Sequence, residues 1–250
     1  MTNEINKNIV KDYLSDLQEK IVDALQLVDG ENFLIDSWQR KEGGGGTTSI
    51  LENGNVFERA GIGYSSVTGS KLPKAATDAR PKVENRKWEA MGVSLVLHPH
   101  NPFVPTVHMN VRFFIASKNG EADIWWFGGG IDLTPYYPFK EDVIHFHQSL
   151  KNTLDPFDKN LYPKFKKNCD DYFLLKHRNE ARGIGGIFFD DFTDNNFEYC
   201  FELIKAIGSS LTKTYLPIVQ KRKDNKFSNK ERDFQLYRRS RYVEFNLLQD

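Results

Sequence analysis

The six histidines of this 250-residue chain all fall between His98 and His177, and they are its most informative candidates for chemistry. Imidazole is the side chain whose charge changes nearest neutral pH, and it is also a common metal ligand. A cluster of inward-facing histidines would therefore suit either proton transfer or metal binding. Which of the six can meet depends on the strands and helices that carry them.

Three consecutive segments predict antiparallel strands, because they are rich in β-branched and aromatic residues and are separated by Pro, Asn and Gly. They are GVSLVLHPH from Gly92, TVHMNVRFFIA from Thr106 and ADIWWFGGGIDLTP from Ala122. Residues two apart in a strand share a face. His108, Asn110 and Arg112 therefore point to one side of the sheet, and the apolar residues between them point to the core.

The first two of these strands are expected to pair as a hairpin. Ser94, Val96 and His98 share one face of the first strand. A hairpin centred on Phe103 sets His98 opposite His108, and Ser94 opposite Arg112. This register gathers imidazoles, a hydroxyl, an amide and a guanidinium on one patch of the sheet.

Two predicted helices carry further histidines. In Glu141–Leu154, His147 lies on the apolar stripe and His145 faces solvent; in Tyr162–Arg182, His177 ends an apolar row of residues spaced four apart. For any one of them the alternative is a core imidazole held by a hydrogen bond. HExxH and other close metal spacings are absent, so the spacing leaves metal binding and proton transfer both open.

Acidic and basic residues near the predicted strands could complete a site. Asp132 follows three glycines that allow a ligand or another strand to approach closely, although it could equally cap a turn with Thr134. Arg178 and Arg182 follow His177 in sequence. Since guanidinium groups bind carboxylates bidentately, a polycarboxylate ligand would suit them, and the alternative is a solvated helix face.

The remaining segments predict an α+β fold in a single domain, with no repeat or linker. Hydrophobic spacing predicts an amphipathic helix over the first 28 residues and a helix over 196–221. Residues 33–64 predict two short strands joined by a pliable glycine loop at 43–46, for which a phosphate-binding role is a weak alternative. The segment from Gly183 predicts a turn and a short buried strand, with Asp190 and Asp191 as structural caps. A capping box at Ser228 predicts a short helix, and residues 242–248 predict a final strand.

Composition excludes several classes of protein. The chain holds 34 Lys and Arg against 34 Asp and Glu, which argues against nucleic-acid binding and membrane-surface binding. No apolar run of about 18 residues predicts a membrane span. The first residues resemble neither a secretory signal nor a transit peptide, so we expect a cytoplasmic protein. Cys169 and Cys200 are too few for a disulfide scaffold or a thiolate zinc site.

Long strings of this sequence resemble the oxygen-dependent coproporphyrinogen III oxidase family. The strings are ATDARP, EAMGVSLVLHPHNPFVPTVHMNVRFF, WWFGGGIDLTPYY, YPKFKKNCDDYFLLKHRNEARGIGGIFFDDF and RSRYVEFNLL, and the resemblance runs in order from about Trp38 to the last residue. It implies oxidative decarboxylation of two propionates of coproporphyrinogen III to vinyl groups, giving protoporphyrinogen IX in haem synthesis. It further implies O₂ as electron acceptor, no organic cofactor, and a homodimer built on an antiparallel sheet flanked by helices on both sides.

The resemblance also implies roles for individual residues. His108 matches the family's proton donor. Ser94, Asn110, Val111 and Arg112 match residues that contact the tetrapyrrole substrate. Asp132 and Asp250 match acidic residues implicated in substrate binding or pyrrole N–H deprotonation. The four histidines assigned to a divalent metal in bacterial members match His98, His108, His147 and His177.

The family pattern continues for several dozen residues beyond the position of Asp250, with a GGR-type substrate motif. The single domain 1–250 is therefore expected to lack that C-terminal segment. Two other hypotheses stand beside the oxidase. One is a non-catalytic truncated homologue that binds a tetrapyrrole or a partner subunit. The other is a hydrolase or oxygenase with a metal held by His98, His108 and Asp132.

Overall fold

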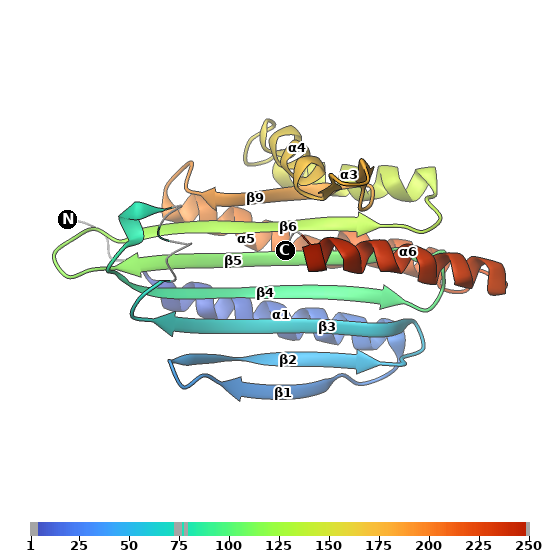
Figure 1. The fold of residues 1–250 in the computed structure, drawn as a ribbon, viewed down its shortest axis with the longest axis horizontal. Helices are drawn as coiled ribbons and strands as arrows, with labels where there is room; N and C mark the ends of the chain where they lie inside the picture. Colours follow the sequence, from blue (N-terminus) through green and yellow to red (C-terminus); the bar gives the residue numbers. More distant parts are fainter. Residues whose placement is uncertain (1–4, 73–76, 78–79, 249–250) are drawn as a thin grey trace.

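Seven strands form one antiparallel sheet in the order β1-β2-β3-β4-β5-β6-β9 (Figure 1). The computed structural model describes residues 5–72, 77 and 80–248. The strands are β1 (Leu34–Gln39), β2 (Gly44–Glu52), β3 (Phe57–Gly69), β4 (Lys87–Pro99), β5 (Thr106–Ser117), β6 (Ile124–Thr134) and β9 (Gly186–Phe192). The first six follow one another as a meander, so each strand pairs with its neighbour in sequence.

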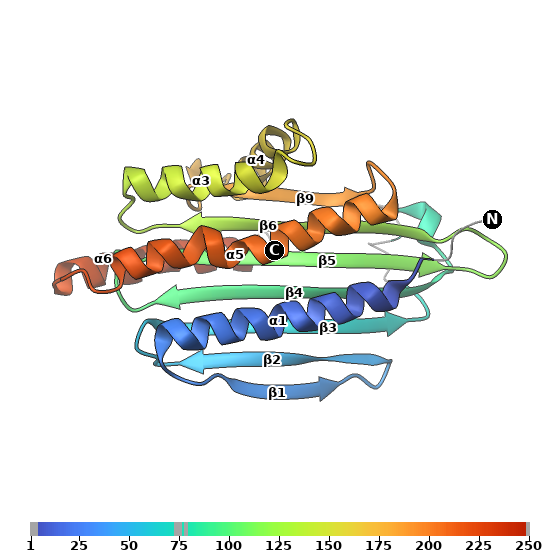
Figure 2. The same cartoon turned by 180° about the vertical axis from the view of Figure 1, so that it is seen from behind.

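Helices cover both faces of this sheet (Figures 1 and 2). On one face lie α1 (Lys7–Asp29) and α5 (Phe197–Arg222), and on the other lies α6 (Asn229–Leu248). The helices α3 (Lys140–Leu154) and α4 (Leu161–Tyr172) lie near the β9 edge. Short elements complete the order: the 3-10 turn η1 (Pro81–Val83) and the hairpin of β7 (Leu174–Leu175) with β8 (Glu180–Ala181). The prediction of an α+β fold with helices on both sides is confirmed.

The hydrophobic core lies between the sheet and the pair α1 and α5. Along β5 the side chains of Val107, Met109, Val111 and Phe113 are almost completely buried on this face. The two helices approach closely because Gly208 of α5 has no side chain: a Cβ there would lie 2.5 Å from the hydroxyl of Tyr13. The period-two pattern of the strands thus assigns the core to one face and leaves the polar residues on the other.

The β4–β5 hairpin is confirmed, but its predicted register is wrong. Ser94 pairs with Asn110 and Val96 pairs with His108, so each partner is two residues away from the predicted one. The Asn101 side chain accepts from Phe103 N–H at 3.0 Å and shapes the connecting turn. Because a shift of two residues preserves the alternation, every side chain keeps its predicted face.

Three local predictions were wrong. The helix predicted over Tyr162–Arg182 ends at Tyr172 and gives way to the β7–β8 hairpin, with His177 in its turn. Residues 242–248 are the last turns of α6 instead of a strand, since Tyr242 and Phe245 are buried at helical spacing. The glycines Gly44–Gly46 belong to β2; a Cβ at Gly46 would lie 2.5 Å from the Trp38 ring.

Among the described residues, no helix has both the length and the apolar composition needed to cross a membrane.

Candidate active site

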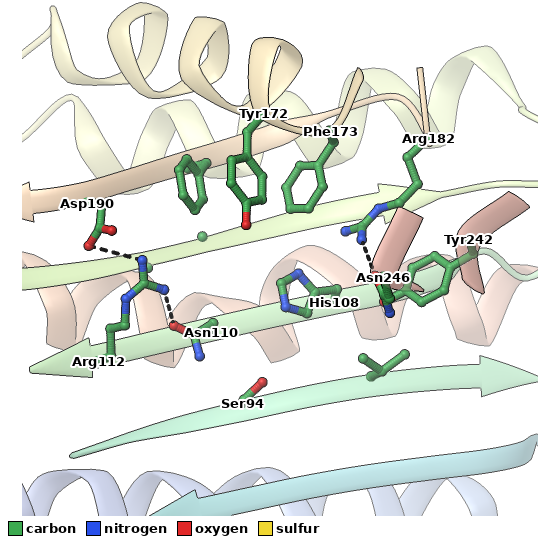
Figure 3. Close-up of a pocket in the computed structure, with 14 residues that line it drawn as sticks. Ser94, His108, Asn110, Arg112, Tyr172, Phe173, Arg182, Asp190, Tyr242 and Asn246 are labelled. Carbon is green, nitrogen blue, oxygen red and sulfur yellow. Dashed lines mark hydrogen bonds and ion pairs between the residues drawn. The ribbon is translucent and has the colours of Figure 1, made fainter. Parts of the chain in front are cut away.

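The face of the sheet opposite α1 and α5 is hollowed into a cleft of about 480 Å³. Figure 3 shows His108, Asn110 and Arg112 projecting from β5 into this cleft, with Ser94 beside them on β4. Its walls come from the end of α4 and from α6. A second hollow of about 360 Å³ continues along the same face and shares Ser94, Asn110, Arg112 and Asp190 with the first. The two form one elongated site.

Glycines make the floor of this face flat. Gly63 pairs with Ser94, and Gly130 pairs with Asn110, so both lie on the cleft side of the sheet. A Cβ at Gly61 would meet nothing within 4 Å, and one at Gly63 would meet only the Ser94 carbonyl at 4.0 Å. A broad ligand can therefore lie directly against the strand backbones.

His108, Asp132 and Arg182 form a linked triad at one side of the cleft. The Asp132 side chain is buried and its two oxygens have different partners: Oδ1 lies 2.8 Å from His108 Nδ1, and Oδ2 accepts from Arg182 at 2.7 Å. The Arg182 guanidinium also lies over the rings of Phe173 and Tyr242, 3.8 and 4.6 Å from their centroids. The triad is rigid because each group is held by at least one other.

The electrostatics of this triad determine which nitrogen of His108 carries the proton. Burial alone would raise the pKa of Asp132, but the charge of Arg182 and the hydrogen bond from His108 outweigh it and lower that pKa. An ionised Asp132 accepts a hydrogen bond from Nδ1–H, so the proton of the neutral imidazole of His108 lies on Nδ1 and not on Nε2. His108 lines the cleft and its side chain is 23% exposed. The arrangement suits a general acid or base that exchanges a proton with a ligand.

Arg112 provides a guanidinium at the other side of the cleft. It donates to Asn110 Oδ1 at 2.6 Å and lies 3.1 Å from Asp190 Oδ1 on β9. Gly128 allows this ion pair to lie on the sheet, since a Cβ there would come within 2.7 Å of Asp190 and 2.8 Å of Arg112. An imidazole suited to proton exchange and a guanidinium suited to carboxylate binding thus line one flat cleft.

A family model described as coproporphyrinogen III oxidase matches residues 9–250. The chain belongs to this family. The predicted resemblance is confirmed, and with it the general function of an oxidoreductase in porphyrin biosynthesis. The match covers every strand and helix that contributes to the cleft.

Four of the residues that the resemblance to the coproporphyrinogen III oxidases singles out line the cleft. Ser94, His108, Asn110 and Arg112 line it together. The Val111 side chain lies on the core face and is 0% exposed, so it cannot touch a ligand in the cleft. Asp250 lies outside the described residues.

The four histidines proposed as metal ligands have separate partners. His98 Nδ1 lies 3.1 Å from the Thr106 hydroxyl, and His147 lies between Ile184 O and the Tyr162 hydroxyl. The remaining partner pairs are His108 with Asp132, and His177 with Glu244. Within residues 5–72, 77 and 80–248, no three His, Cys, Asp or Glu side chains are arranged to hold a metal ion. The described side chains do not fit the divalent metal assigned to bacterial members.

Two histidines, His177 and His145, differ from expectation in burial, whereas His98 is partly buried, as expected. His177 was expected to point inward, but it is exposed because α4 ends before it. His145 was expected to face solvent, but its Nε2 is buried and no partner is present among the described residues. His98 faces α6, where burial and the charge of Arg239 lower its pKa to about 4, so it is neutral near pH 7.

The walls of the cleft include residues that sequence reasoning missed. Tyr172 and Phe173 come from the end of α4, and Tyr242 and Asn246 come from α6. A signal for the α6 residues was present: from Ser228 to the end of the chain no Gly or Pro interrupts the sequence, as a long helix requires. Asp190, predicted to be a structural cap, does accept a hydrogen bond from the Asp191 N–H, and it also pairs with Arg112.

Proposed function

We propose that this chain catalyses the oxygen-dependent oxidative decarboxylation of two propionate side chains of coproporphyrinogen III to vinyl groups, giving protoporphyrinogen IX. The observation that carries the proposal is the position of His108, which faces a flat, glycine-floored cleft with a buried Asp132 behind it and Arg112 alongside. Family membership supplies the substrate class.

The reaction balances with O₂ as the only oxidant. For each side chain, R–CH₂CH₂–COO⁻ + O₂ + H⁺ gives R–CH=CH₂ + CO₂ + H₂O₂. The C–COO⁻ bond breaks, a hydride equivalent leaves the carbon next to the ring, and O₂ takes its two electrons. The enzyme must therefore supply a proton, hold the propionate and expose the reacting carbon to O₂.

The residues of the cleft suit these tasks. We assign the exchangeable proton to His108 Nε2, while Asp132 and Arg182 fix the orientation of the ring through Nδ1. Arg112, with Asn110 and Ser94, is assigned to the substrate carboxylates and pyrrole groups. Since both Asp132 oxygens already have partners, Asp132 acts through His108.

Product analysis tests the proposal. The chain is incubated with coproporphyrinogen III with and without O₂, and porphyrins are separated after oxidation and detected by fluorescence. We expect protoporphyrin only with O₂, and none from His108→Ala. His100→Ala is the control, because His100 does not line the cleft, and it should give normal product. Tetrapyrrole binding without turnover would contradict the proposal and favour a non-catalytic homologue.

We also propose that the chain forms a homodimer, as the resemblance implies. The edge strand β1 supports this: Leu34 is 70% exposed, Ile35 is 62% exposed, and an uncovered apolar edge is a typical pairing surface. Sedimentation equilibrium should give twice the chain mass, and a monomer at every concentration would contradict the proposal.

A further inference from the structure

Two guanidinium groups and two carboxylates meet where the cleft reaches β9. Arg80, which precedes η1, donates to Asp191 through Nε at 3.0 Å and through Nη2 at 2.8 Å, and its Nη2 lies 3.9 Å from Asp190. Figure 1 shows η1 beside the ends of β6 and β9. Arg80 also lies over the Trp126 ring, and Arg112 pairs with Asp190 from the other side. Both arginines line the second hollow.

An irregularity in β9 brings the two carboxylates together. Successive side chains of a regular strand point to opposite faces, yet Asp190 and Asp191 both contact Arg80. The register shifts opposite Phe127–Gly129, and Asp191 has a φ of 50°, in the left-handed region. Asp190 Oδ1 accepts from the Asp191 N–H at 3.0 Å. A bulge of this kind re-aims side chains and is common beside functional sites.

Exposure decides which arginine of the cleft can accept a new partner. The Arg182 and Asp132 side chains are 2% and 3% exposed, so separating them would leave a buried charge unpaired. The Arg80 and Arg112 side chains are each 35% exposed. Exposed ion pairs of this kind contribute little to stability, so an incoming carboxylate can replace the aspartate at small cost.

We propose that Arg80 is a second carboxylate-binding residue of the cleft, which acts with Arg112 on one propionate of the substrate, and that Asp190 and Asp191 are the counter-ions which this propionate replaces. The inference rests on the proposed function, because the ligand carboxylates belong to the tetrapyrrole. Asp190 and Asp191 hold the two guanidinium groups in position when no ligand is present.

Binding of coproporphyrin III, the stable fluorescent oxidation product of the proposed substrate, tests the role of Arg80 directly. Arg80→Gln should raise the dissociation constant about tenfold, as expected for loss of one charge-assisted hydrogen bond. The control is Arg59→Gln, which removes an exposed arginine paired with Glu52 on the neighbouring strand edge. Equal affinity of wild type and Arg80→Gln would overturn the inference.

A second variant distinguishes ligand exchange from a purely structural role of Asp191, because the two roles predict different changes in affinity. Asp191→Asn removes a competing carboxylate, and asparagine tolerates the left-handed backbone, so binding should become about threefold tighter. In the Arg80→Gln background the same change should have no effect. If Asp191 only supported the fold, Asp191→Asn would weaken binding or leave it unchanged, and either result contradicts the exchange.

The two proposals can fail separately. Wild-type turnover of coproporphyrinogen III is measured beside the titrations. Turnover with unaltered binding by Arg80→Gln would overturn the role of Arg80 and leave the proposed function intact. Absence of both turnover and coproporphyrin binding in the wild type would overturn both.

Discussion

Asp132 is the residue on which the candidate site depends most. Its carboxylate is shared between His108, which lines the cleft, and Arg182, which neutralises the buried charge. An aspartate in this position fixes which nitrogen of the imidazole carries the proton and how the ring is oriented. In the proposed reaction, Asp132 therefore contributes through His108.

Replacing this carboxylate by an amide tests that role. Asp132→Asn keeps the shape but presents either a donor or a neutral acceptor to His108, so we expect turnover to fall on the order of 10²- to 10³-fold. Affinity for coproporphyrin III should change little, because Arg112 remains. Steady-state kinetics and fluorescence titration, at a temperature where circular dichroism shows a folded variant, provide the measurement. A loss of affinity with unchanged kcat would contradict a role in proton transfer.

His98 should make stability depend on pH. Burial comes first among the causes that lower its pKa from 6.5 to about 4; Arg239 and Arg59 add to it, and Glu58 opposes it. Protons therefore bind the unfolded chain more readily, and the stability from neutral His98 is complete above pH 6.5 and lost as pH falls toward 4. Between pH 7 and pH 5 this loss is about 2 kcal/mol.

The measurement for His98 is urea unfolding of wild type and His98→Gln at both pH values. The free energy of unfolding should decrease more for the wild type than for the variant. The comparison is needed because burial also lowers the pKa of His147, which titrates in the same direction in both proteins. Identical pH dependence in the two proteins would show that His98 titrates normally.

At the scale of elements, α6 is attached to the sheet by charge as well as by apolar contacts. Glu58 of β3 accepts from Arg232 at 2.8 Å and from Arg239 at 2.8 Å, and Gln235 donates to Pro99 O at 2.9 Å. These contacts hold the helix that supplies Tyr242 and Asn246 to the cleft.

Breaking this attachment should loosen α6 selectively. We expect Glu58→Gln to lower the free energy of unfolding by about 1–3 kcal/mol, since two half-buried arginines lose their counter-ion. Glu52→Gln is a matched control on the same side of the sheet, where the exposed pair with Arg59 should contribute less than about 0.5 kcal/mol. Hydrogen exchange should show faster exchange in α6 for Glu58→Gln alone. Unchanged α6 protection would show that apolar packing suffices.

Prediction from sequence worked best where a single hydrophobic period, such as the two-residue alternation of a strand, dominated a segment. The strands carrying Ser94 and His108 were predicted with the correct faces, because an error of two residues in register leaves the alternation intact. The end of α4 was missed because the apolar row Phe165, Cys169, Phe173 continues at helical spacing after the helix has ended. The sequence of that row does not indicate the hydrogen bond from Arg182 N to Phe173 O, which closes the following hairpin.

The candidate site was predictable in the same uneven way. Residues on one strand face, such as Asn110 and Arg112, follow from alternation. The bulge that turns Asp191 toward Arg80 depends on the pairing of β9 with β6 and on a residue 111 positions away in sequence. The same holds for Tyr242, whose place in the cleft depends on how α6 docks.

At the scale of the whole molecule, the cleft is bounded by β4, β5, β6 and β9 with α4 and α6, so a bound ligand should stabilise the entire domain. At a free concentration one hundred times its dissociation constant, a ligand that binds only the folded state adds about 2.7 kcal/mol. For a chain of this size that corresponds to an increase in Tm of roughly 5–10 °C.

Differential scanning fluorimetry, or calorimetry where porphyrin fluorescence interferes, can measure this shift. Coproporphyrin III should raise Tm, and its tetramethyl ester, which carries no carboxylate for Arg112 to bind, should raise it much less. Equal shifts for acid and ester would indicate that flat apolar contact with the glycine floor dominates binding.

The alternation along β5 has a consequence for how this strand tolerates change. Odd-numbered residues such as Val107, Met109 and Val111 face the core, whereas His108, Asn110 and Arg112 face the cleft. Residues that affect stability thus alternate along β5 with residues that line the candidate site. A mutational scan that records cellular abundance and haem-dependent growth separately should show two signals of period two along β5, out of phase by one residue.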